Sequence, residues 1–144
     1  MLLAHHSDDV AETIFMRMLR GTGVEGIEGP KEERRIGNGK LIRPFLSIPK
    51  TEIQSFLKEN KINFIEDDSN QDNKFDRNFL RNSIFPLLEK RWKGFPNRIN
   101  SMASIIKQRN SNYAKLIHHE YKDLIGNEIE IKKLKEIPTS HVVD

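Results

Sequence analysis

Hydrophobic and polar residues are arranged along the first twenty positions in a pattern that predicts a strand end followed by a helix. Residues 1–4 are largely apolar, as expected where a buried strand ends. Ser7 or Asp8 is the predicted N-cap, because either side chain can accept a hydrogen bond from the free N–H groups of a first helical turn. The helix is expected to bury one apolar face, made of Val10, Ala11, Ile14, Phe15, Met18 and Leu19.

Turn residues divide the middle of the chain into short elements. Residues 34–43 predict a β-hairpin, because the tripeptide Gly37-Asn38-Gly39 separates two short runs that suit strands. Pro49 predicts the start of a helix that reaches about residue 60, since proline suits a first helical position. Residues 62–65 follow as a predicted strand, and the polar residues 66–73 as a loop.

Two helical segments are predicted beyond that loop. The first begins near Arg77 and is kinked or restarted at Pro86, with an inward face of Phe79, Leu80, Ile84, Leu87 and Leu88. Residues 92–96 mark a boundary, after which nearly heptad apolar spacing predicts one long helix from Ile99 to about Ile125. Residues 128–131 are expected to form a short strand, followed by a turn of helix.

Length and composition indicate a soluble, cytoplasmic protein. The 144 residues suffice for one domain, or for most of one and a piece of another. The absence of cysteine excludes disulfides and cysteine-ligated zinc, and neither a signal peptide nor an apolar run near 18 residues is present. The formal net charge is +3, and positions 1–30 carry only 2 of the 24 Lys and Arg residues. The basic later part permits contact with nucleic acid, although solvated helix faces explain it equally well.

A cluster of ionisable residues spans the predicted turn and the start of the first helix. Asp9 and Glu12 are three residues apart, so a helix points both carboxylates the same way, and His5, His6 and Asp8 come just before. In an open α/β sheet, ligands collect at this place, outside the carboxyl end of a strand. The residue types alone leave helix capping, part of a divalent metal site and a site for an ammonium group as alternatives.

Arg77 and Arg81 are candidates for a positively charged group that complements the acidic residues. They are four residues apart and share a helical face. One interpretation is a solvated surface pair that balances the acidic loop 66–73. The other is that Arg77 holds an anionic group while Asp9 and Glu12 hold a cationic one, as recognition of an amino acid requires. The glycine-rich residues 21–30 also allow two interpretations, a loop that cradles a phosphate and a plain turn.

Five short motifs occur in a definite order. They are Ala4-His5-His6-x-Asp8-Asp9-x-Ala11-Glu12-Thr13, Arg20-Gly21-Thr22-Gly23, Leu41-Ile42-Arg43-Pro44, Glu66-Asp67-x-Ser69-Asn70 and Arg77-Asn78-x-x-Arg81. Each motif is modest by itself, but together they closely resemble the bacterial tRNA(Ile)-lysidine synthases, a family of N-type ATP pyrophosphatases with a PP-loop. The resemblance is strong over residues 1–93 and looser over residues 94–144.

The resemblance implies an α/β fold and a ligase reaction. Residues 1–93 would be the C-terminal part of a Rossmann-like PP-loop ATPase domain, and residues 94–144 the start of a helical substrate-recognition domain. In this family ATP activates C2 of a wobble cytidine as an adenylate, and the ε-amine of lysine displaces AMP to give lysidine. The implied partners are tRNA(Ile), L-lysine and ATP, with Mg²⁺ as cofactor and no membrane. The oligomeric state stays open, with a homodimer among the alternatives.

The resemblance also implies roles for individual residues. Asp9, Glu12 and Arg77 would bind the lysine substrate. Other residues would act near the adenylate and the phosphates, with His5, His6 and Asp8 in catalysis and Arg43 and Arg81 in contact with phosphate or tRNA. No dedicated metal ligand is assigned, and whether Asp8 or Glu12 serves Mg²⁺ is open.

The family's Ser-Gly-Gly-x-Asp-Ser pyrophosphate loop, which precedes the His-His motif, has no counterpart in this sequence. We therefore expect an incomplete ATPase domain that is inactive by itself. One alternative is another PP-loop enzyme that acts on a tRNA base, although thiolation enzymes typically use cysteines, which this chain lacks. A second alternative is a non-catalytic RNA-binding module in which residues 94–144 grip phosphates.

Overall fold

The computed structural model describes residues 1–65 and 67–122. The chain divides into two compact units, Met1–Ile106 and Lys107–Asp144. The first unit therefore extends past residue 93, where the sequence places a domain boundary, and that domain assignment stays a prediction. Ile125 and the predicted strand at 128–131, with the turn of helix after it, lie outside the described residues.

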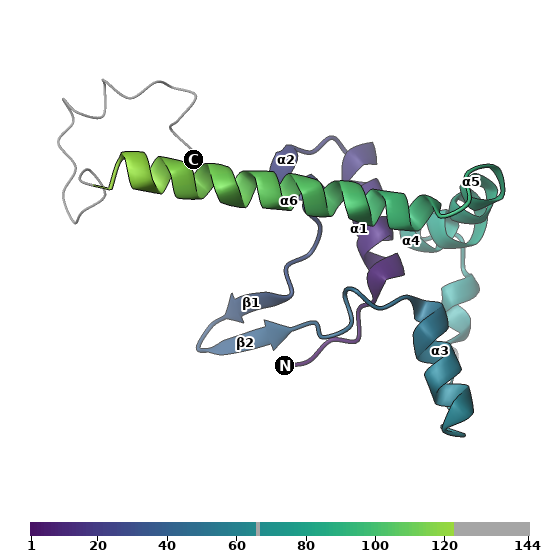
Figure 1. Ribbon diagram of the computed structural model, residues 1–144. Coiled ribbons are helices and arrows are strands. Elements are labelled where there is room, and N and C mark those ends of the chain that lie inside the picture. Colours follow the sequence, from purple (N-terminus) through teal and green to yellow (C-terminus); the bar gives the residue numbers. More distant parts are fainter. Residues whose placement is uncertain (66, 123–144) are drawn as a thin grey trace. The chain divides into compact units, whose positions relative to one another are not determined.

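Short helices and one β-hairpin make up the first unit (Figure 1). In chain order the elements are α1 (Ser7–Leu19), α2 (Val24–Ile27), β1 (Glu33–Ile36), β2 (Gly39–Ile42), α3 (Lys50–Glu59), the 3₁₀-helix η1 (Asp68–Gln71), α4 (Asp76–Phe79), the π-helix η2 (Leu80–Ile84), α5 (Phe85–Arg91) and α6 (Phe95–Glu120). The last helix begins in the first unit and ends in the second, before the predicted end near residue 125. Within the described ranges, no helix has the length and apolar character needed to span a membrane.

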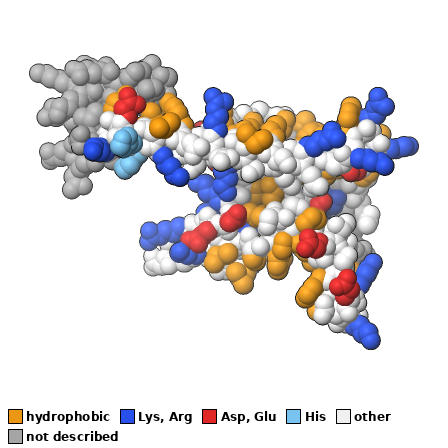
Figure 2. Space-filling model, viewed as in Figure 1, with side chains coloured by type: hydrophobic (Ala, Val, Ile, Leu, Met, Phe, Trp, Pro, Cys, Tyr) orange, Lys and Arg blue, Asp and Glu red, His pale blue; other side chains and the backbone are white. Residues whose placement is uncertain are grey.

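The predicted hairpin is confirmed. Strands β1 and β2 pair antiparallel, with Ile36 opposite Gly39, and Gly37 adopts a φ of +54° in the turn between them. Glycine suits this left-handed backbone because it has no Cβ. Lys and Arg side chains gather at the outer end of the hairpin (Figure 2).

The predicted strand at residues 1–4 is wrong. Only Leu2 forms a bridge, parallel to Ile42, in which the N–H of Ile42 donates to the carbonyl of Met1 at 3.0 Å. The next donor of a parallel ladder would be the N–H of residue 44, and Pro44 has none. The ladder therefore stops after one bridge.

The core of the first unit lies where α1, α5 and the start of α6 meet. Its buried side chains are Ala11, Ile14, Phe85, Ile99 and Ala103. Beside them, the rings of Phe15, Phe85 and Phe95 meet edge to face at centroid distances of 5.5 to 5.9 Å, an arrangement that aromatic quadrupoles favour. Met18 and Leu19, which were expected in the core, are exposed, because the last turn of α1 is left uncovered by the described elements.

A π-helix changes the phase of the helical segment that follows the polar loop. Residues 76–91 are helical throughout, but η2 interrupts α4 and α5 with wider turns. As a result Leu80 and Phe85, five residues apart, are buried, whereas Phe79 and Leu87 are exposed although the sequence places them inward. The predicted restart at Pro86 is confirmed, since it lies in the first turn of α5.

The connection from α3 to η1 differs from its prediction. Helix α3 begins at Lys50, one residue later than predicted, and Pro49 is its N-cap. Residues 62–65 form no strand, because the N–H of Ile62 donates back to the carbonyl of Leu57 at 2.9 Å and closes α3. Lys61 turns the chain there with a φ of +54°.

The start of α1 is fixed by His6 and not by Ser7 or Asp8. The N–H of His6 donates to Asp9 Oδ2 at 3.0 Å, and the N–H of Asp9 donates to His6 Nδ1 at 3.4 Å. This reciprocal capping leaves Asp8 free for another element, and its Oδ2 accepts from the N–H of Lys50 at 2.8 Å. Asp8 thus joins the starts of α1 and α3.

Replacing Asp8 by Asn is expected to destabilise the chain at neutral pH but not in acid. Hydrogen bonds from the His6 side chain and the Lys50 N–H, opposed by partial burial, lower the pKa of Asp8 from 3.8 to about 2. Such a carboxylate stabilises the folded state above pH 3.8, and this contribution is lost as the pH falls through about 2. We expect a loss of about 1 kcal/mol at pH 7, after allowance for solvent screening, measured by urea unfolding.

The control for this substitution is Glu59→Gln, which removes an exposed carboxylate at the end of α3. It should change the free energy of unfolding little at either pH. A destabilisation by Asp8→Asn that stays constant from pH 7 to pH 2 would contradict the assignment.

Replacing Phe85 by Ala is expected to destabilise the first unit much more than replacing Leu87 by Ala. Phe85 is 7% exposed and Leu87 is 65% exposed. Removing the buried ring should cost about 3–5 kcal/mol, whereas truncating Leu87 should stay within about 0.5 kcal/mol. Thermal unfolding of both variants measures the difference. A larger loss for Leu87→Ala would overturn the helix phase set by η2.

Candidate functional site

Four charged side chains meet between α1 and the helix that follows the polar loop. The guanidinium of Arg77 donates to Glu12 Oε2 and to Asp9 Oδ1, each at 2.8 Å. Arg81 donates to Glu12 Oε1 at 2.6 Å, to Glu12 Oε2 at 2.8 Å and to Asp9 Oδ1 at 2.9 Å. We call Asp9, Glu12, Arg77 and Arg81 the charge cluster. The interpretation of the two arginines as a surface pair that balances loop 66–73 is wrong.

Because the charge cluster is largely buried, each of its charges depends on the others for stabilisation. Glu12 is only 2% exposed, and Asp9 is also buried, whereas the side chains of Arg77 and Arg81 are 37% and 27% exposed. Hydrogen bonding to Glu12 raises the pKa of Arg81 above its ordinary value, with a further contribution from the charge of Asp9. Removing one member of a buried ion pair typically costs about 3–5 kcal/mol, because the remaining charge loses its compensation.

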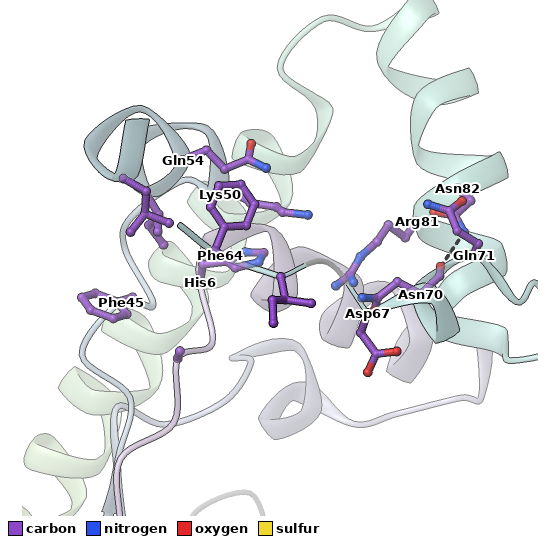
Figure 3. Close-up of a pocket in the computed structure, with 14 residues that line it drawn as sticks. His6, Phe45, Lys50, Gln54, Phe64, Asp67, Asn70, Gln71, Arg81 and Asn82 are labelled. Atoms are coloured by element: carbon purple, nitrogen blue, oxygen red, sulfur yellow. Dashed lines mark hydrogen bonds between the residues drawn. The ribbon is translucent and has the colours of Figure 1, made fainter. Parts of the chain in front are cut away.

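A cavity of about 380 Å³ lies beside the charge cluster (Figure 3). His6 and Arg81 reach toward it from opposite sides, and Asp67 and Asn70 lie below Arg81 in this view. Its apolar wall consists of Ala4, Phe45, Ile53, Leu57, Phe64 and Ile65. Its polar wall consists of His6, Lys50, Gln54, Asp67, Asn70, Gln71, Arg81 and Asn82. The cavity therefore suits a ligand with a flat apolar part and an anionic group, which Lys50 and Arg81 can contact.

The sequence-predicted residues do not all meet at this cavity. The structure brings Asp9, Glu12, Arg77, Arg81 and His6 together, whereas His5 and Arg43 contact each other elsewhere. Arg43 Nε donates to His5 Nδ1 at 3.1 Å, and its Nη1 donates to the carbonyl of Lys31 at 2.8 Å. Neither His5 nor Arg43 lines the cavity.

Sequence reasoning missed Lys50 and two asparagines that position the cavity wall. Asn78 Nδ2 donates to the carbonyls of Ser69 and Asp72 at 2.8 and 2.9 Å, and Asn82 Nδ2 donates to the carbonyl of Asn70 at 2.9 Å. Their spacing of four residues, one position after each arginine, is a signal that could have revealed them. The position of Lys50 directly after Pro49 likewise indicates a free N–H at a helix start.

The carboxylates of this region do not fit a magnesium site. Both oxygens of Glu12 accept from guanidinium groups, and Asp8 Oδ2 accepts from the N–H of Lys50. Over residues 1–65 and 67–122 no group of three or more His, Cys, Asp or Glu side chains could hold a metal ion. Hard cations need several free oxygen ligands, which these carboxylates do not offer in the observed arrangement.

Comparison with known proteins relates the chain to tRNA-modifying enzymes. It is 37% identical over 126 residues to a tRNA(Ile)-lysidine synthase of Legionella pneumophila (strain Lens), which covers 88% of this chain and 29% of that protein. Proteins of the same name in Pseudomonas fluorescens (strain Pf0-1) and Haemophilus ducreyi (strain 35000HP / ATCC 700724) are 45% and 38% identical, over 64% and 92% of this chain and 21% and 32% of their own lengths.

The chain spans less than a third of each of these relatives. Residues 1–88, more than half of this chain, match the model of the PP-loop domain. This matched range contains the whole charge cluster and all residues that line the cavity. The chain belongs to the PP-loop domain family.

Proposed function

We propose that this chain carries the lysine- and adenylate-binding residues of an ATP-dependent enzyme that forms lysidine in tRNA(Ile). The observation that carries the proposal is the charge cluster beside a cavity of mixed character. Two buried carboxylates suit an ammonium group and a guanidinium suits a carboxylate. An α-amino acid presents both groups. The names of the relatives give tRNA(Ile) and lysidine, and the family resemblance implies lysine as the amino acid.

In this proposal the head of lysine binds at the charge cluster. Asp9 and Glu12 hold the α-ammonium, and Arg77 holds the α-carboxylate. The ε-amine then extends into the cavity, where the adenylated cytidine would lie against the apolar wall. His6 lines that cavity, and its Nδ1, which accepts from the N–H of Asp9 while the ring is neutral, would take the proton that the ε-ammonium must lose. The carboxylate of Asp8, 3.4 Å from His6 Nδ1, would then stabilise the charged ring.

The reaction then forms one bond and breaks another at C2 of the cytidine. The ε-nitrogen of lysine attacks C2, and the bond from C2 to the adenylate oxygen breaks as AMP leaves. Lys50 and Arg81, both on the cavity wall, would stabilise the charge on the departing phosphate. Arg43, with His5 beside it, would contact the tRNA backbone from outside the cavity. One copy of the chain supplies all these residues, so the proposal requires no homodimer.

The proposal includes the Rossmann-like arrangement that the family resemblance implies. The parallel bridge between Leu2 and Ile42 supports it, because parallel pairing is characteristic of such sheets. Asp9 and Glu12 belong to the helix that follows the first paired segment, a position at which α/β folds bind ligands.

RNA binding without catalysis is a second candidate function, which one feature of the hairpin favours. Arg34, Arg35 and Lys40 are exposed there, and Arg35 lies directly opposite Lys40. Lys40 Nζ pairs with Glu33 Oε1 at 2.6 Å, so phosphate contacts of the hairpin would come mainly from Arg34 and Arg35. The two candidates differ in which residues matter, so separate substitutions distinguish them.

Replacing Asp9 by Asn is expected to weaken lysine binding by about 10-fold or more, because a charged hydrogen bond to the ammonium is lost. Because the chain spans less than a third of its relatives, binding is the appropriate measurement, made by titration calorimetry with L-lysine. Nα-acetyl-lysine, which has no α-ammonium, should bind poorly to the unchanged chain. Asp76→Asn, which breaks only the exposed ion pair with Arg20, is the control. Equal affinity of the unchanged chain and Asp9→Asn for lysine would contradict the assignment.

Replacing both Arg34 and Arg35 by Ala is expected to weaken tRNA(Ile) binding and to lower its salt dependence. Each lost phosphate contact should reduce the slope of log affinity against log salt by about 1. Lys58→Ala, at an exposed position of α3, is the control, and Asp9→Asn should leave tRNA affinity nearly unchanged. An unchanged salt slope in the double variant would exclude the hairpin as an RNA contact.

A further inference from the structure

The charge cluster leaves no room for a further cation beside Arg77 and Arg81 in the arrangement observed. Asp9 Oδ1 accepts from both arginines, and Asp9 Oδ2 accepts from the N–H of His6. Glu12 Oε1 accepts from Arg81, and Oε2 accepts from both arginines. Every carboxylate oxygen therefore has a donor already. Since Glu12 is 2% exposed, an ammonium cannot reach it while both guanidinium groups cover it.

Of the two arginines, Arg81 is the one that a ligand in the cavity meets. Arg81 lines the cavity, whereas Arg77 does not. Arg81 also belongs to η2, and Arg77 to α4. Figure 3 shows the guanidinium of Arg81 directed into the cavity on the side where Asp67 lies. A ligand that enters from the cavity therefore has Arg81 between itself and the two carboxylates.

We propose that Arg81 occupies the ammonium position of the charge cluster in the ligand-free chain and leaves it when an amino acid binds. This inference rests on the proposed function, in which Asp9 and Glu12 hold an α-ammonium and Arg77 holds the α-carboxylate. Arg81 thereby acts as an internal competitor that a substrate must displace. Displacing Arg81 costs the free energy of its hydrogen bonds to the carboxylates. Only a ligand that offers both an ammonium for the carboxylates and a carboxylate for Arg77 compensates for that cost. Arg81 therefore determines specificity for zwitterionic amino acids.

The cavity offers the displaced side chain a second place. Asp67 and the amide groups of Asn70 and Gln71 lie on the same wall, so the guanidinium can exchange one set of acceptors for another without leaving the protein. Because a fraction of molecules must adopt this second arrangement before binding, the observed affinity for lysine is lower than the affinity of the open site. Removing Arg81 should abolish that penalty.

The test is titration calorimetry of the full 144-residue chain with L-lysine, comparing Arg81→Met with the unchanged chain. We expect Arg81→Met to bind lysine at least about 10-fold more tightly. Arg77→Met, which removes the same charge from the same cluster, should bind it more weakly. Arg20→Met, which breaks only an exposed ion pair with Asp76, is the matched control and should bind like the unchanged chain.

A second measurement addresses folding, because Arg81→Met leaves two buried carboxylates with one partner. Lysine should raise the melting temperature of Arg81→Met by more than it raises that of the unchanged chain, since it refills the vacated position. Arg81→Lys keeps a shorter cation and should show an intermediate affinity if Arg81→Met does not fold.

Three results would count against the inference in distinguishable ways. If the unchanged chain binds lysine and Arg81→Met binds it equally or less tightly, the displacement is wrong and the proposed function stands. If Arg81→Met is unfolded with and without lysine and Arg81→Lys binds no more tightly than the unchanged chain, Arg81 is purely structural. If the unchanged chain and both Arg81 variants all fail to bind lysine, the proposed function itself is wrong.

Discussion

Two buried carboxylates determine how the first unit is assembled. A carboxylate that leaves water loses several kcal/mol of hydration, which only close and well-directed partners offset. Glu12 and Asp9 find those partners in Arg77 and Arg81, so α4 and η2 are held against α1 by charge. Next to these ion pairs, Ile14 of α1 and Phe85, the first residue of α5, belong to one apolar core.

The pairing also controls the cavity wall, because one helical segment serves both. The segment that presents the arginines carries Asn78 and Asn82, which bond to the backbone of residues 69–72. Any rotation of this segment that moves the guanidinium groups therefore moves the polar loop as well. The charge cluster and the cavity wall behave as one mechanical unit, although they come from stretches far apart in the sequence.

Local signals were enough to predict elements whose cause is local. Gly37 and Asn38 determine the hairpin turn, and Pro49 the start of α3, through the backbone conformations of those residues alone. The failures have non-local or unusual causes. The strand at residues 1–4 is cut short by the missing N–H of Pro44, and the π-helix that turns Leu87 outward leaves no mark in hydrophobic periodicity.

In the candidate site, too, features with a local cause were predicted and tertiary features were not. Helical spacing predicts correctly that Asp9 and Glu12 point the same way and that Arg77 and Arg81 share a face. That the two pairs meet depends on tertiary structure, and spacing alone made a solvated surface pair the default interpretation of the arginines. Cavity residues such as Phe45 and Phe64 escaped prediction because aromatic side chains near a helix end resemble ordinary core residues.

The sequence separation within the charge cluster has a consequence for biosynthesis. The hydrogen bonds of Asp9 and Glu12 to the arginines join residues 65 to 72 positions apart. At a ribosomal rate of about 5–20 residues per second, roughly 3 to 14 s separate the synthesis of the carboxylates from that of the arginines. During that interval α1 has an uncompensated acidic face and must remain hydrated. Because of these buried ion pairs, the first unit can complete its folding only after its later half has been synthesised.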